Sequence, residues 1–208
     1  MVPTFGDNQR EDTMGDAVKK IAVVQGMQGV SVQELFRDLA RHWRASARLV
    51  GVIAEDHGLP ERACSAGYLR SVLDGERFPI FQDLGSGSKD CHLVPDGALA
   101  AAAAVRRDIA TGCDLVLLSK FGKLEAGGGG LHDAFAAAIE AGVPVLTTVS
   151  PACVAAWDVF AAPLFTLVPA DAERIEAWWQ AVRPGVGHLL PVYEAAHSWL
   201  QSSNGSEM

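Results

Sequence analysis

Short aliphatic runs of strand length alternate along the chain with longer segments in which apolar residues recur at helical spacing. The runs predict strands, and the segments between them predict helices that cross from one strand to the next. Because strand–helix–strand units join parallel strands, this order predicts an α/β domain of three layers with a doubly wound, mainly parallel sheet. The predicted strands are 20–24, 49–53, 114–119, 143–149 and 165–168, and the predicted helices are about 32–46, 96–111, 131–141, 170–182 and 191–201.

Residues 55–95 interrupt this alternation. Two short apolar runs, 68–73 and 77–81, flank the segment Asp74–Glu76, which contains an Asp-Gly pair. Asp-Gly favours tight turns between strands, so the sequence predicts a β-hairpin inserted into the α/β domain. A polar, glycine-rich loop follows at 83–92.

Three positions carry signals for helix ends. Ser31 is predicted to be the N-cap of the first helix, with Glu34 completing a capping box. Asp96 is predicted to cap the alanine-rich helix that follows the 83–92 loop. Gly142 is predicted to end the 131–141 helix as a C-cap glycine.

The length and charge of the chain limit the number of domains and the kinds of function that we expect. A chain of 208 residues is long enough to bury one sizeable core, and we expect one domain over 19–201, a disordered leader at 1–18 and a disordered tail at 202–208. The net charge of −8 argues against nucleic acid as the main partner. No apolar stretch approaches the roughly 20 residues that span a bilayer, and the polar N-terminus does not resemble a signal peptide. The expected location is therefore the cytoplasm, without membrane association.

The loop after the first strand resembles a phosphate-binding loop in outline. A working P-loop reads G-x-x-x-x-G-K-[ST], in which the lysine reaches phosphates and the hydroxyl binds magnesium. Counted from Gly26, the second glycine position is Ser31, the lysine position is Val32 and the hydroxyl position is Gln33. This is a degenerate Walker A loop, and Gly26, Gln28, Gly29 and Ser31 are left as backbone or hydroxyl donors for an anion at a helix N-terminus. The alternative is a tight turn whose glycines serve the backbone alone.

The loop after the 114–118 strand begins with Ser119 and Lys120, where a P-loop enzyme has acidic residues for magnesium. Lys120 and Lys123 would attract an anion directly, and Lys120 is a candidate replacement for the missing P-loop lysine. Glu125 is a candidate binding residue, or a partner of Lys123 that holds the shape of the loop. The alternative is a solvated pair of structural lysines.

The 83–92 loop offers a second set of donors. Gly85, Ser86 and Ser88 combine exposed backbone N–H groups with hydroxyls, an arrangement that suits a tetrahedral oxyanion. The alternative is a flexible surface linker, for which such composition is typical. The carboxyl ends of parallel strands meet at one edge of a sheet, so we expect this loop and Lys120 at the same edge.

The cysteines indicate neither a zinc ribbon nor a disulfide framework, because none of the four belongs to a CxxC pair. Cys64, Cys91 and His92 are weak candidates for metal ligands, and otherwise no metal site is expected. Tryptophans 178 and 179 are predicted to cover the core or an oligomer contact, and a homodimer is the oligomer considered.

The segments 119–125 and 83–88, together with Cys91, resemble a bacterial family of uncharacterised domains often encoded beside molybdate-transport genes. The resemblance covers about residues 20–182. The family is distantly similar to small P-loop nucleoside triphosphatases, which implies a P-loop NTPase-like fold. It carries no settled activity, and its genetic setting implies molybdenum handling.

Three functions follow as expectations. The first is a non-catalytic protein that binds a small oxyanion such as molybdate, or the phosphate of a nucleotide, with no cofactor identified. The second is a divergent nucleoside triphosphatase or nucleotide-dependent transferase that uses Lys120. The third is an interaction module whose sheet edge is vestigial.

Overall fold

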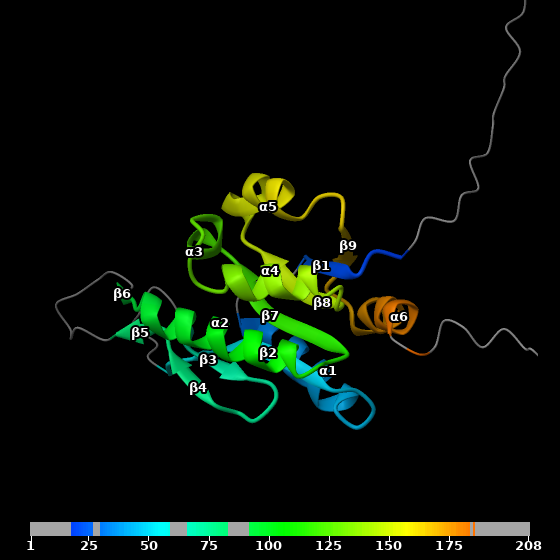
Figure 1. Cartoon of the computed structure of the whole chain (residues 1–208), viewed down its shortest axis with the longest axis horizontal. Helices are drawn as coiled ribbons and strands as arrows, with labels where there is room; N and C mark the ends of the chain where they lie inside the picture. The colour runs from blue at the N-terminus through cyan, green and yellow to red at the C-terminus, as the bar shows by residue number, and fades with distance from the viewer. Residues whose placement is uncertain (1–17, 27–29, 59–65, 83–91, 184, 186–208) are drawn as a thin grey trace, which may run out of the picture.

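A seven-stranded sheet with helices on both faces forms the centre of the computed structural model (Figure 1). The structure describes residues 18–26, 30–58, 66–82, 92–183 and 185. The strands of the sheet are β1 (Ile21–Gln25), β2 (Leu49–Asp56), β3 (Ala66–Ser71), β4 (Arg77–Pro79), β7 (Leu115–Phe121), β8 (Val145–Val149) and β9 (Phe165–Pro169). The helices are α1 (Val30–Trp43), α2 (Pro95–Ala110), α3 (Lys123–Ala126), α4 (His132–Glu140), α5 (Val154–Ala161) and α6 (Ala172–Val182), with a 3-10 turn at Pro151–Cys153.

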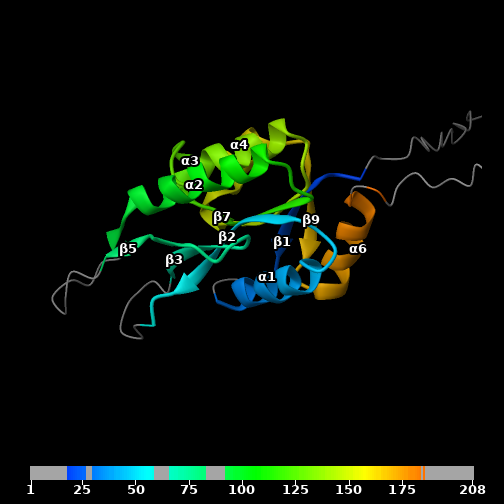
Figure 2. The ribbon, with the colours of Figure 1, turned by 60° about the horizontal axis from the view of Figure 1, so that its bottom comes forward.

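The strand order is β4-β3-β2-β7-β8-β1-β9. The five strands from β2 to β9 in this order are parallel, and β3 and β4 extend the sheet in antiparallel fashion. Helices α1 and α6 cover one face, and α2, α3 and α4 lie on the other (Figure 2). The α/β class and the mostly parallel sheet expected from the sequence are therefore confirmed, and the architecture is compatible with a P-loop-like fold.

The central strands are buried on both faces, which explains why their sequences are nearly continuous aliphatic runs. In β7, Leu115 and Leu117 pack with α1 and α6, while Val116 and Leu118 pack on the opposite face with α2, α4 and α5. All four side chains are fully buried. This alternation assigns each residue from Leu115 to Leu118 to one side of the sheet.

Two of the three predicted helix caps are wrong, because the helices begin at other residues. Helix α1 begins at Val30, so Ser31 lies in its first turn and the predicted capping box with Glu34 is wrong. Helix α2 begins at Pro95, whose missing N–H suits the first helical position, and Asp96 lies in the first turn instead of capping it.

The cap at Gly142 is confirmed. Its φ of 63° is left-handed, and its N–H donates to the Ile139 carbonyl at 3.0 Å. The N–H of Val143 donates to the Ala138 carbonyl at 3.1 Å, which completes a Schellman motif at the end of α4.

Beyond β2 the chain forms β3 and β4, which pair antiparallel, with Tyr68 opposite Pro79 and Arg70 opposite Arg77. The turn between them contains Gly75, with a φ of 83°. Phe81, which the sequence assigned to the second of these strands, belongs instead to β5 (Phe81–Gln82), which pairs with β6 (His92–Leu93).

Several predicted segments lie outside the described residues: the leader at 1–18 except for Val18, the 83–92 loop except for His92, the 191–201 helix and the 202–208 tail. Helices α3 and α5 were not predicted. In the part of the chain that the structure describes, no helix is both long and apolar enough to span a membrane.

Candidate functional site

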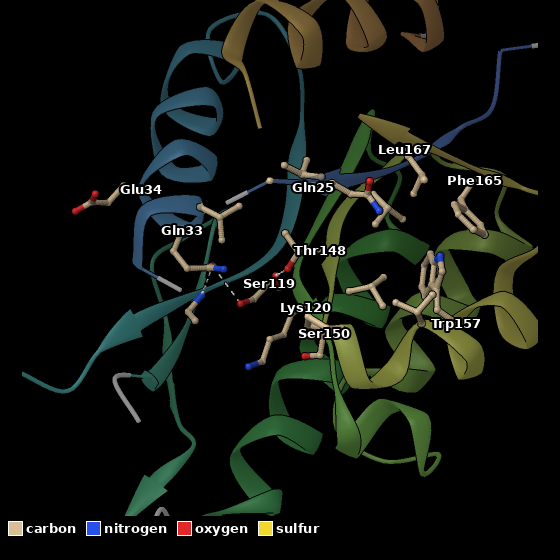
Figure 3. Close-up of a pocket in the computed structure, with 18 of the residues that line it drawn as sticks. Gln25, Gln33, Glu34, Ser119, Lys120, Thr148, Ser150, Trp157, Phe165 and Leu167 are labelled. Atoms are coloured by element: carbon tan, nitrogen blue, oxygen red, sulfur yellow. Dashed lines mark hydrogen bonds between the residues drawn. The ribbon is translucent and has the colours of Figure 1, made fainter. Parts of the chain in front are cut away.

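A cavity of about 840 Å³ opens at the carboxyl edge of the parallel strands. The carboxyl ends of β1, β2, β7 and β8 contribute to its lining, together with the first half of β9, the first turns of α1 and residues of α5. Ligands of open α/β sheets bind at this edge. The cavity has a polar side, with Gln33, Ser119 and Lys120, and an apolar side, with Trp157, Phe165 and Leu167 (Figure 3).

Lys120 reaches this cavity because β7 contains a bulge. Leu118 pairs with Thr147 of β8, and the next pair is Phe121 with Val149, so β7 has one residue more than its partner over this interval. Bulges re-aim side chains and are frequent next to functional sites. Here the extra residue lets Phe121 pack in the core beside α4 and α5, while Lys120 is exposed and lines the cavity.

Ser119 and Gln33 form a buried, uncharged pair on the polar side. The Ser119 Oγ donates to Gln33 Oε1 at 3.1 Å, and the same oxygen accepts the Ala54 N–H at 3.2 Å. Gln33 is 8% exposed and Ser119 is 3% exposed. The pair ties α1 to the ends of β7 and β2, and it occupies the positions that the P-loop pattern assigns to a hydroxyl and a carboxylate.

The loop after β1 is described only in part. Gly26 lines the cavity with a φ of 91°, and, chain neighbours aside, no atom of the described residues lies within 4 Å of the position that a Cβ would take. Val32, at the lysine position of the P-loop pattern, is buried in the core beside α6. Ser31 is exposed and does not line the cavity. Gln28 and Gly29 lie outside the described residues.

Sequence analysis missed the carboxylates at the end of β2. Glu55 lines the cavity and pairs with Arg70 Nη1 at 2.9 Å and with Arg77 Nε at 2.8 Å. Burial raises the pKa of Glu55, but the hydrogen bond from Arg70 and the charges of both arginines outweigh it, so the pKa lies below its ordinary value. Asp56 also lines the cavity, and its carboxylate accepts the Gly58 N–H at 2.5 Å. Both residues lie at the carboxyl end of a predicted parallel strand, and this position alone could have identified them as site candidates.

The apolar side was also missed, because α5 was not predicted. Trp157 is 1% exposed and packs against Phe121, Phe135, Phe160 and Phe165, with ring centroids 5.1 to 6.0 Å away. An aromatic side chain held this firmly gives the cavity a rigid wall suited to a flat apolar group.

Glu125 and Lys123 lie apart from the cavity lining. Glu125 is 7% exposed, and its carboxylate accepts the Gly122 N–H at 2.8 Å and the Leu131 N–H at 2.9 Å. It thereby closes the turn around α3. Lys123 is exposed on α3. The structure thus brings Gly26 and Lys120 together and keeps Ser31, Lys123 and Glu125 away.

The remaining candidates lie mostly outside the described residues: Gly85, Ser86, Ser88, Cys64 and Cys91, with only the backbone of His92 described. Across the described ranges, no three His, Cys, Asp or Glu side chains gather as a metal site would require.

The comparisons with known proteins place the chain in a family. A family model described as "Protein of unknown function (DUF2478)" matches residues 21–178. A curated relative, "Molybdenum import ATP-binding protein ModC 2" of Bradyrhizobium diazoefficiens, is 36% identical over 147 residues. These residues are 70% of this chain but 16% of that protein, so its name describes a much longer molecule. No solved structure matches. The chain belongs to the DUF2478 family.

Proposed function

We propose that this member of the DUF2478 family binds a small phosphate-bearing ligand, a nucleotide in the first place, at the carboxyl edge of its sheet. The observation that carries the proposal is the cavity of about 840 Å³, with a lysine on one side and an aromatic wall on the other. Small-molecule sites typically enclose about 300–1,000 Å³. A tetrahedral oxyanion alone fills a small part of this volume, whereas a nucleotide has both an anionic group and a flat ring.

Each side of the cavity has a role in this proposal. Lys120 supplies the positive charge, and the backbone at Gly26 supplies donors from a degenerate Walker A loop without its lysine. Trp157 and Phe165 support the ring. Contributions from Gln28, Gly29 and Ser31, and from the 83–92 loop with Gly85, Ser86 and Ser88, remain predictions.

Binding without hydrolysis is the preferred form. P-loop enzymes hold magnesium with a hydroxyl and a carboxylate, and the magnesium ion neutralises the charge that develops on the phosphates. Gln33 and Ser119 at the corresponding positions are both uncharged and are bonded to each other. The chain therefore offers no acidic anchor at that place.

A nucleoside triphosphatase or nucleotide-dependent transferase is the second candidate. Glu55 and Asp56 favour it, because both line the cavity and magnesium is commonly held by one or two carboxylates together with phosphates. Against it, the charge of Glu55 is already balanced by Arg70 and Arg77.

Molybdenum handling is the proposed cellular context. The name of the Bradyrhizobium diazoefficiens relative combines molybdenum import with ATP binding. Either ligand class suits a site with Lys120 at its polar side, so molybdate and nucleotides are to be compared directly.

The deciding experiment is calorimetric titration of the full chain with ATP, ADP, AMP, molybdate and sulfate, with magnesium and with EDTA, alongside an assay of phosphate release. We expect nucleotide binding that persists in EDTA, is weakened by Lys120→Ala and is not accompanied by phosphate release. Lys123→Ala is the matched control, because it removes the same charge outside the cavity.

Other outcomes discriminate among the alternatives. Magnesium-dependent phosphate release that Lys120→Ala abolishes would establish the enzyme. Molybdate binding without nucleotide binding would mean that the cavity binds an oxyanion and is not a nucleotide site. Absence of heat and of thermal shift with every ligand would overturn the proposal and favour an interaction module.

A further inference from the structure

A second, smaller cavity of about 190 Å³ lies between α1 and the strands β2 and β3. Arg37 and Arg41 reach it from α1, where their spacing of four residues puts them on one helix face, and Arg44 reaches it from the turn directly after α1. Arg70 reaches it from β3, and Glu55 from β2. We call this cavity the arginine groove.

The groove is positively charged in a chain whose net charge is −8. Arg77 adjoins it through its ion pair with Glu55. Among the residues that the structure describes, the carboxylates paired with these arginines are Glu55 and Asp38. Five arginines against two carboxylates leave an excess of three positive charges. Like charges at this helical spacing repel each other, and an anion in the groove would relieve that repulsion.

The arginines have N–H donors for which the described part of the chain offers no acceptor. Arg37 Nε donates to the Gln33 carbonyl at 3.3 Å, and Arg44 donates to the Val72 carbonyl. Arg41 pairs with Asp38 at 2.7 Å, and its side chain is still 74% exposed. A guanidinium group carries five N–H donors in a planar fork that matches phosphate oxygens. The groove can therefore hold an anion with charge-assisted hydrogen bonds from more than one side.

The arginine groove is a neighbour of the large cavity, and Arg37 and Glu55 line both. We propose that the groove is a second anion subsite that takes a phosphate group. The phosphate belongs either to the ligand of the large cavity, in which case the inference rests on the proposed function, or to a separate phosphate-bearing molecule.

The test uses the full chain, inorganic tripolyphosphate as the first probe, and the double substitution Arg41→Gln and Arg44→Gln. Arg106→Gln with Arg107→Gln is the matched control, because both residues lie on α2, on the opposite face of the sheet. We expect tripolyphosphate affinity to fall at least about tenfold in the groove variant and to stay within about twofold in the control. Arg41→Gln alone, at an exposed side chain, tests the same idea with little risk to folding and should weaken binding about threefold.

Titration with ATP and AMP separates the two sources of the phosphate. If the distal phosphates reach the groove, the groove variant weakens ATP binding and leaves AMP binding unchanged. If the phosphate belongs to a separate molecule, tripolyphosphate still binds wild-type protein saturated with ATP.

Failure of the groove and failure of the proposed function give different results. The proposal that the groove is an anion subsite would be wrong if tripolyphosphate bound the groove variant and the control equally well, or did not bind wild-type protein. This holds even if nucleotides bind. Loss of tripolyphosphate binding in the groove variant, with no nucleotide binding by any form, would support the groove and overturn the proposed function.

Discussion

The segment Ser119–Glu125 contains two regions, each with a charged side chain, and the surroundings of the two charges differ. In the first, a bulge in β7 exposes Lys120 to the cavity, where it forms no ion pair with any described residue. In the second, Glu125 is buried and accepts two backbone N–H groups. A charged side chain stabilises the fold where backbone N–H groups donate hydrogen bonds to it. Where the backbone exposes the side chain to a cavity instead, its charge is available to a ligand.

Substitution of Glu125 gives the largest expected effect and tests whether its buried carboxylate stabilises the fold. Glu125→Ala leaves the N–H groups of Gly122 and Leu131 buried without their acceptor, so we expect a loss of about 3 kcal/mol in the free energy of unfolding. Chemical denaturation measures it, with Glu140→Ala, at an exposed position of α4, as the control. A change under about 0.5 kcal/mol, the size of an ordinary surface substitution, would show that Glu125 does not support the fold.

Lys120 is expected to show the opposite behaviour. Because its side chain is exposed, Lys120→Ala should change the free energy of unfolding by less than about 0.5 kcal/mol. Loss of one charge-assisted contact should weaken binding of a triphosphate nucleotide about tenfold, or about 1.4 kcal/mol. Calorimetric titration of Lys120→Ala and Lys123→Ala side by side makes the comparison, and equal losses of affinity would remove the distinction between the two regions.

Sequence alone predicted the parts of the fold that depend on local pattern. Buried parallel strands appear as aliphatic runs, and the alternation with helices follows from the layers that must cover them. Lys120 could be named as a site residue because it follows a strand whose carboxyl end had to lie at the ligand edge. Gly142 could be named because a left-handed position after a helix favours glycine.

The rest of the site depends on contacts between distant segments. Gln33 meets Ser119 across 86 positions, and neither residue type signals that pairing. The bulge at Lys120 arises from the register of β7 against β8, which no pattern in either strand reveals. Helix α5 is short and mostly apolar, without the polar face that marks an amphipathic helix, so its Trp157 was not assigned to the site.

The Ser119–Gln33 pair lies between the two extremes, because it joins scaffold and cavity. Ser119→Ala removes the hydroxyl donor, while Gln33 Oε1 keeps the Ala54 N–H. We expect a loss of about 1 kcal/mol in the free energy of unfolding, the usual contribution of one neutral hydrogen bond. Thermal or chemical denaturation measures it, with Ser46→Ala, at an exposed position in the turn after α1, as the control. A loss as large as that of Glu125→Ala would mean that the pair is a main support of the sheet edge.

Substitution of Glu55 is expected to have the smallest effect on stability, and this effect should depend on pH. Its carboxylate resembles that of Glu125 in being paired, but its partners are the half-exposed side chains of Arg70 and Arg77, so solvent screens the interaction. Because the pKa of Glu55 is lower in the folded chain than its ordinary value of 4.5, its pairing stabilises the fold above that pH. The contribution is lost as the pH falls through the folded pKa.

Glu55→Gln should therefore reduce the stability of the chain at pH 7 and make less difference as the pH is lowered below 4.5. Denaturation midpoints of both forms, measured from pH 7 to about pH 3, give this difference directly. A difference that stays constant over the whole range would mean that Glu55 acts through packing or neutral hydrogen bonds. In that case, its charge would be available to a cation in the cavity, and the magnesium-dependent alternative would gain support.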